Sequence, residues 1–201
     1  LYLPGGYPEL SARELAANVS MRASLRAFCA LNRPVWAECG GYMYLLEGLL
    51  DADGAAHPMC GVLPGRARML PRRAALGYRQ ARTLAPGPLG PAGTVLRGHE
   101  FHYSQYEPAQ EGAAPVSAAF ALAGADGAEV LDGQARGNMG AGYVHAHLAS
   151  NPEAALAFCQ AHARTIYKSI SGERSIVTEF GPSDLERLPL LRHAPLQQHE
   201  L

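Results

Sequence analysis

The stretch "VWAECGGYMYL", residues 35–45, is the most informative segment of the chain. An apolar run that predicts a strand is followed by a cysteine, two glycines and a second apolar run that predicts a helix. A sharp strand-to-helix turn lifts a side chain out of a sheet, and glycines are needed beside it because a Cβ there would collide with neighbouring backbone. Residues 35–45 therefore predict a strand, a tight turn that carries Cys39, and a helix.

The segments on either side continue this alternation. "LYLPGG" (residues 1–6) predicts a strand that runs into a glycine turn, and it starts so abruptly that we expect the chain to be truncated on its N-terminal side. Ser11 and Glu14 form the S-x-x-E pattern of a capping box, which predicts a helix over residues 12–30. A strand over 33–38, a helix over 41–50 and a turn at residues 53–54 follow.

Alternating strands and helices favour an α/β fold with a doubly wound, mostly parallel sheet, whose functional loops lie at the carboxyl ends of the strands. The middle of the chain differs, because short candidate strands separated by Gly and Pro predict an antiparallel insertion there. These candidate strands are residues 60–65, 76–84, 93–98, 101–106 and 117–124, with Asp126–Gly127 as a candidate hairpin turn.

The last predicted elements are a strand through Tyr143 and Val144 and a helix with Asn151 as its N-cap and Pro152 at its first position. We expect one domain over residues 1–164. Residues 165–201 have no sustained hydrophobic period and contain several Pro and Gly breaks, so we expect them to be a C-terminal tail of unknown role.

Composition excludes several functions. A net charge of -1 over 201 residues provides no field that would gather nucleic acid or anionic lipid. No apolar run approaches the roughly 20 residues that cross a bilayer, and the first residues lack the basic start of a signal peptide, so we expect a cytoplasmic protein. The 4 cysteines show no CxxC pairing, which argues against a zinc knuckle or a disulfide framework.

A thiol at such a turn has a specific chemical use. Free N–H groups at the start of the helix would favour the thiolate of Cys39, and the N–H of Gly40 would stabilise the oxyanion of a tetrahedral intermediate. The alternative is that Cys39 is a small buried core residue, as most lone cysteines are.

The histidines offer a base for that thiol. His145 and His147 alternate along a predicted strand and so share one face, with Tyr143 beside them. No metal site is expected, because "HEFH" lacks the spacing of H-E-x-x-H and no carboxylate or cysteine stands close to "HAH" to complete a ligand set. His99 and His102 are interpreted as hydrogen-bonded structural residues.

Five motifs occur together in a characteristic order: "LYLPGGYPE", "PVWAECGGYMYL", "LGYRQA", "RGHEFHYS" and "YVHAHLASNP". Over residues 1–164 the chain thereby resembles the glutaminase half of cobyrinate (or hydrogenobyrinate) a,c-diamide synthases. The resemblance implies a class I glutamine amidotransferase domain of the cobyric acid synthase type. Such a domain hydrolyses glutamine and passes ammonia to a second domain, where ATP activates the a and c acetate side chains of a corrin for amidation in cobalamin biosynthesis.

The resemblance also implies roles for individual residues. Cys39 would be the nucleophile, His145 its base, and Gly5 and Gly6 a loop that donates a backbone N–H to the oxyanion opposite that of Gly40. Class I glutaminases carry a glutamate two residues after the base, but here His147 stands at that position. We therefore expect a cysteine–histidine dyad, with His147 as at most an orienting or substrate contact. The resemblance assigns no role to "RGHEFHYS".

One departure from the family pattern is the lack of a phosphate-binding G-x-x-x-x-G-K-[ST] loop. We therefore expect no cofactor in this chain, with ATP and Mg²⁺ bound by a synthetase domain that is missing here. L-glutamine, that domain and a corrinoid are the expected partners. Two alternatives stay open: a non-catalytic binding module that has kept the fold, and a cysteine hydrolase that acts on another amide.

Overall fold

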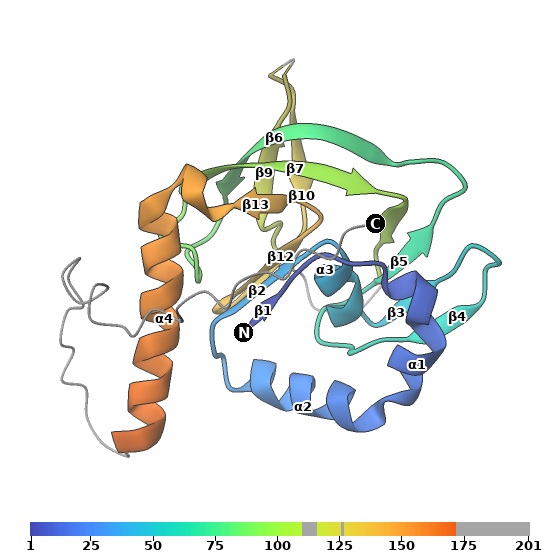
Figure 1. Cartoon of the computed structure of the whole chain (residues 1–201), viewed down its shortest axis with the longest axis horizontal. Helices are drawn as coiled ribbons and strands as arrows, with labels where there is room; N and C mark the ends of the chain where they lie inside the picture. Colours follow the sequence, from blue (N-terminus) through green and yellow to red (C-terminus); the bar gives the residue numbers. More distant parts are fainter. Residues whose placement is uncertain (110–115, 126, 172–201) are drawn as a thin grey trace, which may run out of the picture.

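The computed structural model describes residues 1–109, 116–125 and 127–171, in which strands outnumber helices (Figure 1). The helices are η1 (Pro8–Ser11), α1 (Ala12–Ala17), α2 (Val19–Ala30), α3 (Gly40–Leu45), η2 (Leu148–Ser150) and α4 (Pro152–Ser171). The strands are β1 (Tyr2–Leu3), β2 (Val35–Glu38), β3 (Gly48–Leu50), β4 (Ala56–Pro58), β5 (Arg66–Met69), β6 (Ala75–Thr83), β7 (Val95–His102), β8 (Ser104–Glu107), β9 (Phe120–Ala123), β10 (Glu129–Asp132), β11 (Gln134–Arg136), β12 (Met139–Gly142) and β13 (His145–His147).

The central sheet has the strand order β1-β2-β12-β11 and contains the predicted strand-to-helix turn. Strands β1 and β12 both pair with β2 in parallel, and β11 closes one edge in the antiparallel direction. All four residues of β2 are buried. Such continuous burial is typical of a parallel strand that is covered on both faces, and the α/β fold class predicted from the sequence is confirmed.

The antiparallel part is larger than the sequence predicted and forms two more sheets. A five-stranded sheet has the order β10-β9-β6-β7-β13, and an outer sheet has the order β4-β3-β5-β8, in which only β3 and β5 are parallel. Of the predicted middle strands, residues 60–65 are not a strand. Strands β9 and β10 form the expected hairpin, but Asp126 of its predicted turn lies outside the described residues.

Two helix predictions need correction. The helix predicted over residues 12–30 is broken at Asn18, whose side chain accepts a hydrogen bond from the N–H of Met21 at 3.1 Å and so caps α2. Ser11 makes no side-chain cap, so the predicted capping box does not form. The helix predicted over residues 41–50 ends at Leu45, because residues 48–50 pair with β4 and β5 instead.

The strand predicted through Tyr143 and Val144 is not continuous. These two residues carry the chain from β12 in the central sheet to β13 in the five-stranded sheet. The carboxylate of Asp132 holds the crossing in place, because it accepts hydrogen bonds from the N–H of Tyr143 at 2.9 Å and of Val144 at 3.2 Å. His145 and Tyr143 therefore do not lie side by side on one strand, as the sequence had suggested.

The last helix begins as predicted and continues past residue 164. Asn151 caps α4 by accepting the N–H of Ala154 at 3.2 Å, and Pro152 occupies the first position. The helix runs to Ser171 along one flank of the molecule (Figure 1). The other residues of the expected tail lie outside the described part of the chain.

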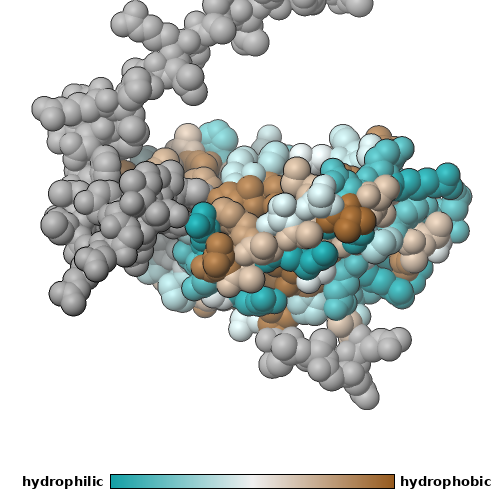
Figure 2. Space-filling view, turned by 90° about the horizontal axis from the view of Figure 1, so that it is seen from below, coloured by the Kyte–Doolittle hydropathy of each residue, from teal (hydrophilic) through white to brown (hydrophobic). Residues whose placement is uncertain are grey.

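The hydrophobic core has two parts, one on each face of the central sheet. Val35 and Ala37 belong to the cluster that packs against α2 and α3, whereas Trp36 belongs to the cluster under the five-stranded sheet. This division follows from the alternation of side chains along β2. The surface on the α2 side carries apolar residues interspersed with polar ones (Figure 2). Among the described helices, none combines the length and the hydrophobicity of a membrane span.

Candidate active site

Cys39 lies at the junction of β2 and α3 in a backbone conformation that side chains rarely adopt, with φ 45° and ψ -106°. Its N–H donates to the carbonyl of Gly142 at 2.8 Å, which fixes the turn against β12. A Cβ on Gly40 would lie 2.6 Å from the carbonyl oxygen of Gly6, so only glycine fits at this position. The predicted tight turn is present, and its strain is of the kind found at nucleophile elbows.

The thiol of Cys39 is buried, with a residue exposure of 7%, and it is close to two backbone donors. Burial raises the pKa of the thiol to about 11, although hydrogen bonds from the N–H groups of Gly40 and Gly6 act in the opposite direction. The sequence predicted that the start of the helix would favour the thiolate. In the structure, desolvation outweighs the two N–H donors, and the resting group is a thiol.

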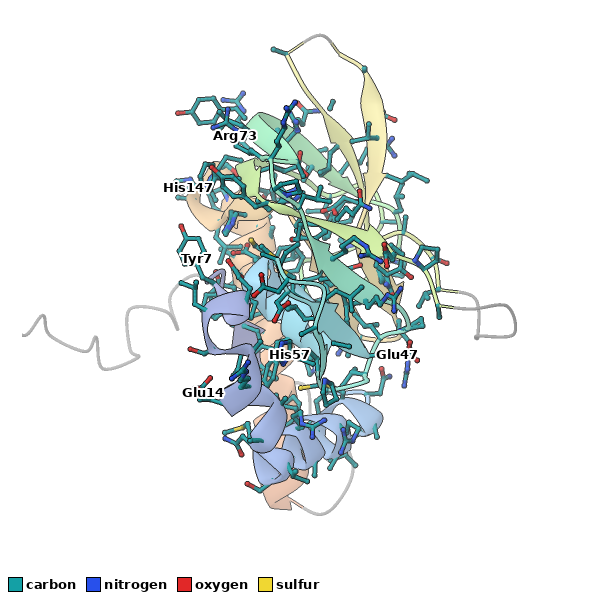
Figure 3. The ribbon with its side chains drawn as sticks, turned by 90° about the vertical axis from the view of Figure 1, so that its right-hand side faces the viewer. Tyr7, Glu14, Glu47, His57, Arg73 and His147 are labelled. Carbon is teal, nitrogen blue, oxygen red and sulfur yellow. The ribbon has the colours of Figure 1, made fainter. Side chains whose placement is uncertain are left out.

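A narrow cavity of about 20 Å³ reaches Cys39 and is lined by residues from four parts of the chain. Tyr7 and Glu9 come from the segment after β1, and His102 and Ser104 come from β7 and β8. Burial raises the pKa of the Glu9 carboxyl group. Tyr7 projects on the same side of the molecule as His147 (Figure 3).

His145 is half-buried at the start of β13 and is held by two neighbours. Its ring packs so closely on Gly5 that a Cβ there would overlap it, and it stacks on the ring of His99 with 4.8 Å between centroids. Burial lowers the pKa of His145; His99 and His102 lower it further by charge repulsion, whereas Glu38 raises it. The imidazole is therefore neutral at pH 7, as a general base requires.

The loop of residues 4–6 connects the two candidate catalytic residues, since Gly5 touches the ring of His145 and the N–H of Gly6 lies at the sulfur of Cys39. In the part of the chain that the structure describes, no hydrogen bond joins Cys39 to His145 directly. The structure thus brings Cys39, Gly40, Gly5, Gly6 and His145 together around one loop.

His147 is placed differently. It is exposed, whereas His145 is half-buried, and it pairs with Arg97 across β7 and β13. Strand alternation puts it on the same face as His145, as predicted, but one residue pair further from Gly5. Its proposed role as an orienting or substrate contact remains a prediction.

The two histidines of "RGHEFHYS" have structural contacts. His102 faces an oxygen at each ring nitrogen, with Nδ1 2.7 Å from the carbonyl of Ser104 and Nε2 3.4 Å from the carboxylate of Glu100. Its ring also stacks on Tyr143, with 4.0 Å between centroids. His99 stacks on His145. These contacts support the structural interpretation, and they show that the motif forms one wall of the site.

Sequence reasoning missed two carboxylates near the site, Glu9 and Glu38. Glu9 follows the glycine loop and reaches the cavity, whereas Glu38 directly precedes Cys39 and is 3% exposed. The sequence signal for Glu38 was a charged residue at the end of the apolar run of β2. Glutamate is almost never buried without partners, so its position predicts hydrogen bonds or an ion pair. No three His, Cys, Asp or Glu residues of the described ranges are grouped as a metal site would require.

Comparison with known proteins agrees with this geometry. The model of the CobB/CobQ-like glutamine amidotransferase domain matches residues 1–153, which include every candidate site residue. The chain belongs to the CobB/CobQ-like glutamine amidotransferase family. The resemblance inferred from the five ordered motifs is thereby confirmed.

Curated relatives of this amidotransferase domain are named cobyrinate or hydrogenobyrinate a,c-diamide synthases. Over 160 residues the chain is 51% identical to cobyrinate a,c-diamide synthase of Syntrophotalea carbinolica, covering 79% of this chain and 34% of that protein. It is 42% identical over 157 residues to hydrogenobyrinate a,c-diamide synthase of Pseudomonas aeruginosa, covering 78% and 33%. The chain thus spans about a third of the length of these relatives.

A solved structure described as a glutamine amidotransferase superposes on this amidotransferase domain with a TM-score of 0.55. The match covers 81% of this chain and 78% of the other, at 17% sequence identity. At that identity the likeness concerns the fold alone, and it agrees with the class I amidotransferase-like architecture predicted from the sequence.

Proposed function

We propose that this chain is the glutaminase portion of an ATP-dependent corrinoid amidotransferase, and that it hydrolyses L-glutamine through a thioester on Cys39. The observation that carries the proposal is the strained turn at Cys39, where the N–H groups of Gly40 and Gly6 both lie at the sulfur. Donors arranged in this way suit an oxyanion that forms beside the sulfur during acyl transfer.

In the proposed reaction the Cys39 sulfur attacks the carboxamide carbon of glutamine while His145 accepts the thiol proton. The oxyanion accepts hydrogen bonds from Gly40 and Gly6. The C–N bond then breaks, His145 returns the proton to the nitrogen, and ammonia leaves. Water hydrolyses the thioester to glutamate and restores the thiol.

The pKa directions decide when the proton moves. The pKa of Cys39 is raised to about 11 by burial and that of His145 is lowered, so the resting pair is a neutral thiol and a neutral imidazole. Proton transfer therefore accompanies attack on the carbonyl instead of preceding it, as in a serine hydrolase. Binding of glutamine is needed before the thiol becomes a strong nucleophile.

Glu9 supports glutamine as the substrate. Its carboxylate lines the same cavity as Cys39 and is near enough to influence the thiol electrostatically. Glutamine carries an α-ammonium group a few bonds from its carboxamide, and an acidic group in the same cavity as the nucleophile suits that cation. A simple aliphatic amide would leave Glu9 without a counter-charge.

The rest of the reaction belongs to a region outside this sequence. The matched region covers about a third of each named relative, and the 201 residues contain no phosphate-binding loop. We infer that a synthetase domain binds ATP and Mg²⁺ and uses the released ammonia to amidate the a and c acetates of cobyrinate or hydrogenobyrinate. Adding a separately expressed synthetase domain should raise glutamine hydrolysis, because such interfaces complete and gate active sites.

The test is covalent labelling of Cys39 in a Cys159→Ser background, because Cys159 is exposed and would react by itself. A glutamine analogue with an electrophilic diazoketone should add one label, and L-glutamine should compete. Cys39→Ala should remove both labelling and glutamate release, whereas Cys60→Ala, the matched change at another buried thiol, should keep both.

The same experiment separates the alternatives. A non-catalytic binding module would bind glutamine without forming the covalent adduct. A hydrolase for another amide would form the adduct, but L-glutamine would not slow it. If Cys39→Ala released glutamate at nearly the rate of the parent protein, Cys39 would not be the nucleophile.

A further inference from the structure

Glu38 is a buried carboxylate between the central sheet and the five-stranded sheet, and the proposed reaction does not yet use it. It is the last residue of β2 and its exposure is 3%. It shares a face of β2 with Trp36, which packs under the five-stranded sheet. A carboxylate at such a position carries a large desolvation cost unless hydrogen bonds or an opposite charge compensate it.

Three hydrogen bonds hold this carboxylate. Oε1 accepts from the indole Nε1 of Trp36 at 2.8 Å and from the N–H of Ala146 at 2.9 Å, and Oε2 accepts from the hydroxyl of Tyr2 at 2.7 Å. Burial, together with the Glu38 carboxylate, raises the pKa of Tyr2, so this phenol stays protonated and donates. All three donors are neutral groups.

The bond to Ala146 has a structural reason. Strand β13 is the edge strand of its sheet, with β7 on one side only. An edge strand has outward backbone N–H groups that lack a strand partner. Glu38 supplies the acceptor for Ala146 from a different sheet, and Ala146 directly follows His145. The carboxylate therefore fixes the backbone beside the candidate base.

The negative charge of Glu38 is not balanced by a cationic side chain in the part of the chain that the structure describes. Within the described ranges no arginine or lysine forms an ion pair with it. The charged and titratable groups that act on His145 are Glu38 from β2 and His99 and His102 from β7. Of these, only Glu38 is negative, so it is the group that favours a positive charge on the His145 ring.

We propose that Glu38 is the positioning residue of the catalytic base: it holds β13 in place through Ala146 and stabilises the imidazolium that forms on His145 when Cys39 gives up its proton. The inference rests on the proposed function. It supplies the carboxylate that the sequence lacks two residues after the base, where His147 stands. In this chain the carboxylate that acts on His145 belongs to Glu38, the residue directly before Cys39.

Glu38→Gln separates charge from hydrogen bonding. The glutamine oxygen can accept from Trp36 and Ala146, and the Tyr2 hydroxyl can turn to accept from the new amide group. The variant keeps the fold contacts and loses only the charge. Glu107→Gln is the matched control, because it removes the same charge from β8, where Glu107 pairs with Arg66 and Arg68.

The main readout is the pKa of His145, followed by NMR of its imidazole across pH in the full chain. We expect Glu38→Gln to lower this pKa by about one unit, and Glu107→Gln to leave it unchanged. Glutamine hydrolysis at neutral pH should fall about tenfold in Glu38→Gln, and further in Glu38→Ala, which also leaves the Ala146 N–H without its acceptor. An unchanged His145 pKa in Glu38→Gln overturns the proposal.

A measurement on the unmodified protein covers the case in which Glu38→Gln does not fold. With ¹³C-labelled glutamate, the Glu38 carboxyl resonance should show an inflection at the His145 pKa, since coupled groups report each other's titration. A Glu38 resonance that ignores the His145 titration overturns the proposal. Neither NMR measurement needs glutamine. A wild-type chain without glutaminase activity would therefore count against the proposed function, whereas the two NMR titrations alone would decide whether Glu38 stabilises the His145 imidazolium.

Discussion

At the residue scale, the arrangement around His145 balances opposing charges. His99 stacks on its ring and disfavours the imidazolium, whereas Glu38 favours it, and burial adds to the first effect. The resting imidazole is neutral and can accept a proton at pH 7. If His145 is the catalytic base, the lowest pH at which it can accept a proton depends on its burial and on the charges of His99 and Glu38.

We expect the acid limb of kcat/KM for glutamine to have a midpoint below 6.5, because the pKa of His145 is lowered from that value. Activity is lost as pH falls through the lowered pKa, where His145 becomes protonated and can no longer accept the thiol proton. His99→Phe keeps an aromatic ring on His145 and removes the charge repulsion, so its midpoint should move to higher pH. A wild-type midpoint above 7 would contradict this assignment.

The two histidines of β13 should differ sharply in single-turnover measurements. His145→Asn should abolish thioester formation, because an amide cannot take up the thiol proton that the imidazole is proposed to accept. His147→Asn should lower the rate only modestly, since this side chain is exposed, whereas the ring of His145 packs on Gly5. The reverse result would place the base two residues later than we do.

The sequence predicted which residues lie close to Cys39 better than it predicted their electrostatics. Cys39, Gly40, the Gly5–Gly6 loop and His145 were each found from motifs and are brought together in the structure. The direction of the Cys39 pKa was not predicted, because the thiol lies among Met43, Met69 and other residues that come together only in the fold. Glu38 was hidden for the same reason, since its partner Ala146 lies 108 residues away.

At the element scale, the loop between β1 and η1 lies between Gly40, beside Cys39, and the ring of His145. Gly5→Ala should reduce glutamine turnover by roughly 100-fold, because the added methyl group overlaps the His145 ring and displaces it. Gly6→Ala should have a much smaller effect, since nothing lies within 4 Å of its added Cβ and its N–H is retained. Equal losses in the two variants, measured with matched circular dichroism spectra, would contradict this view of the loop.

Asp132 gives a prediction about stability. Burial raises the pKa of this carboxyl to about 6, against a usual value of 3.8. Between about pH 4 and 6 the folded chain holds a proton that the unfolded chain has released, so the free energy of unfolding falls as pH rises, by up to about 3 kcal/mol. Urea titrations should show that Asp132→Asn lacks this contribution, whereas Glu129→Gln, at an exposed position of the same strand, retains it.

The elements that the sequence predicted correctly have local causes. The turn at Cys39 and the cap at Asn151 depend on residues a few positions apart. The helix predicted over residues 41–50 ends early, at Leu45, because residues 48–50 are held as β3 by β4 and β5, and tertiary pairing of this kind overrides helix propensity. Asn18 broke the first helix because its side chain caps the following turn.

At the scale of the whole molecule, β2 is the element that both core clusters share. Val35 and Ala37 pack on one side and Trp36 on the other, where its ring meets Phe120 edge-on with 5.2 Å between centroids. Trp36 is the only tryptophan in the sequence. Its fluorescence therefore reports on the contact between the central and five-stranded sheets, which is also the contact that holds Glu38.

Because that contact joins the two sheets, we expect the chain to unfold as one unit. Phe120→Ala should destabilise the protein by about 3–5 kcal/mol, since the ring is 2% exposed and its removal leaves a cavity against Trp36. Tryptophan fluorescence and far-UV circular dichroism should shift together in urea. Leu76→Ala, at a position that is 56% exposed, should stay within about 0.5 kcal/mol of the wild type. If Phe120→Ala moved the fluorescence transition and left the circular dichroism transition in place, the five-stranded sheet would open independently, and His145 would separate from Cys39 without unfolding of the central sheet.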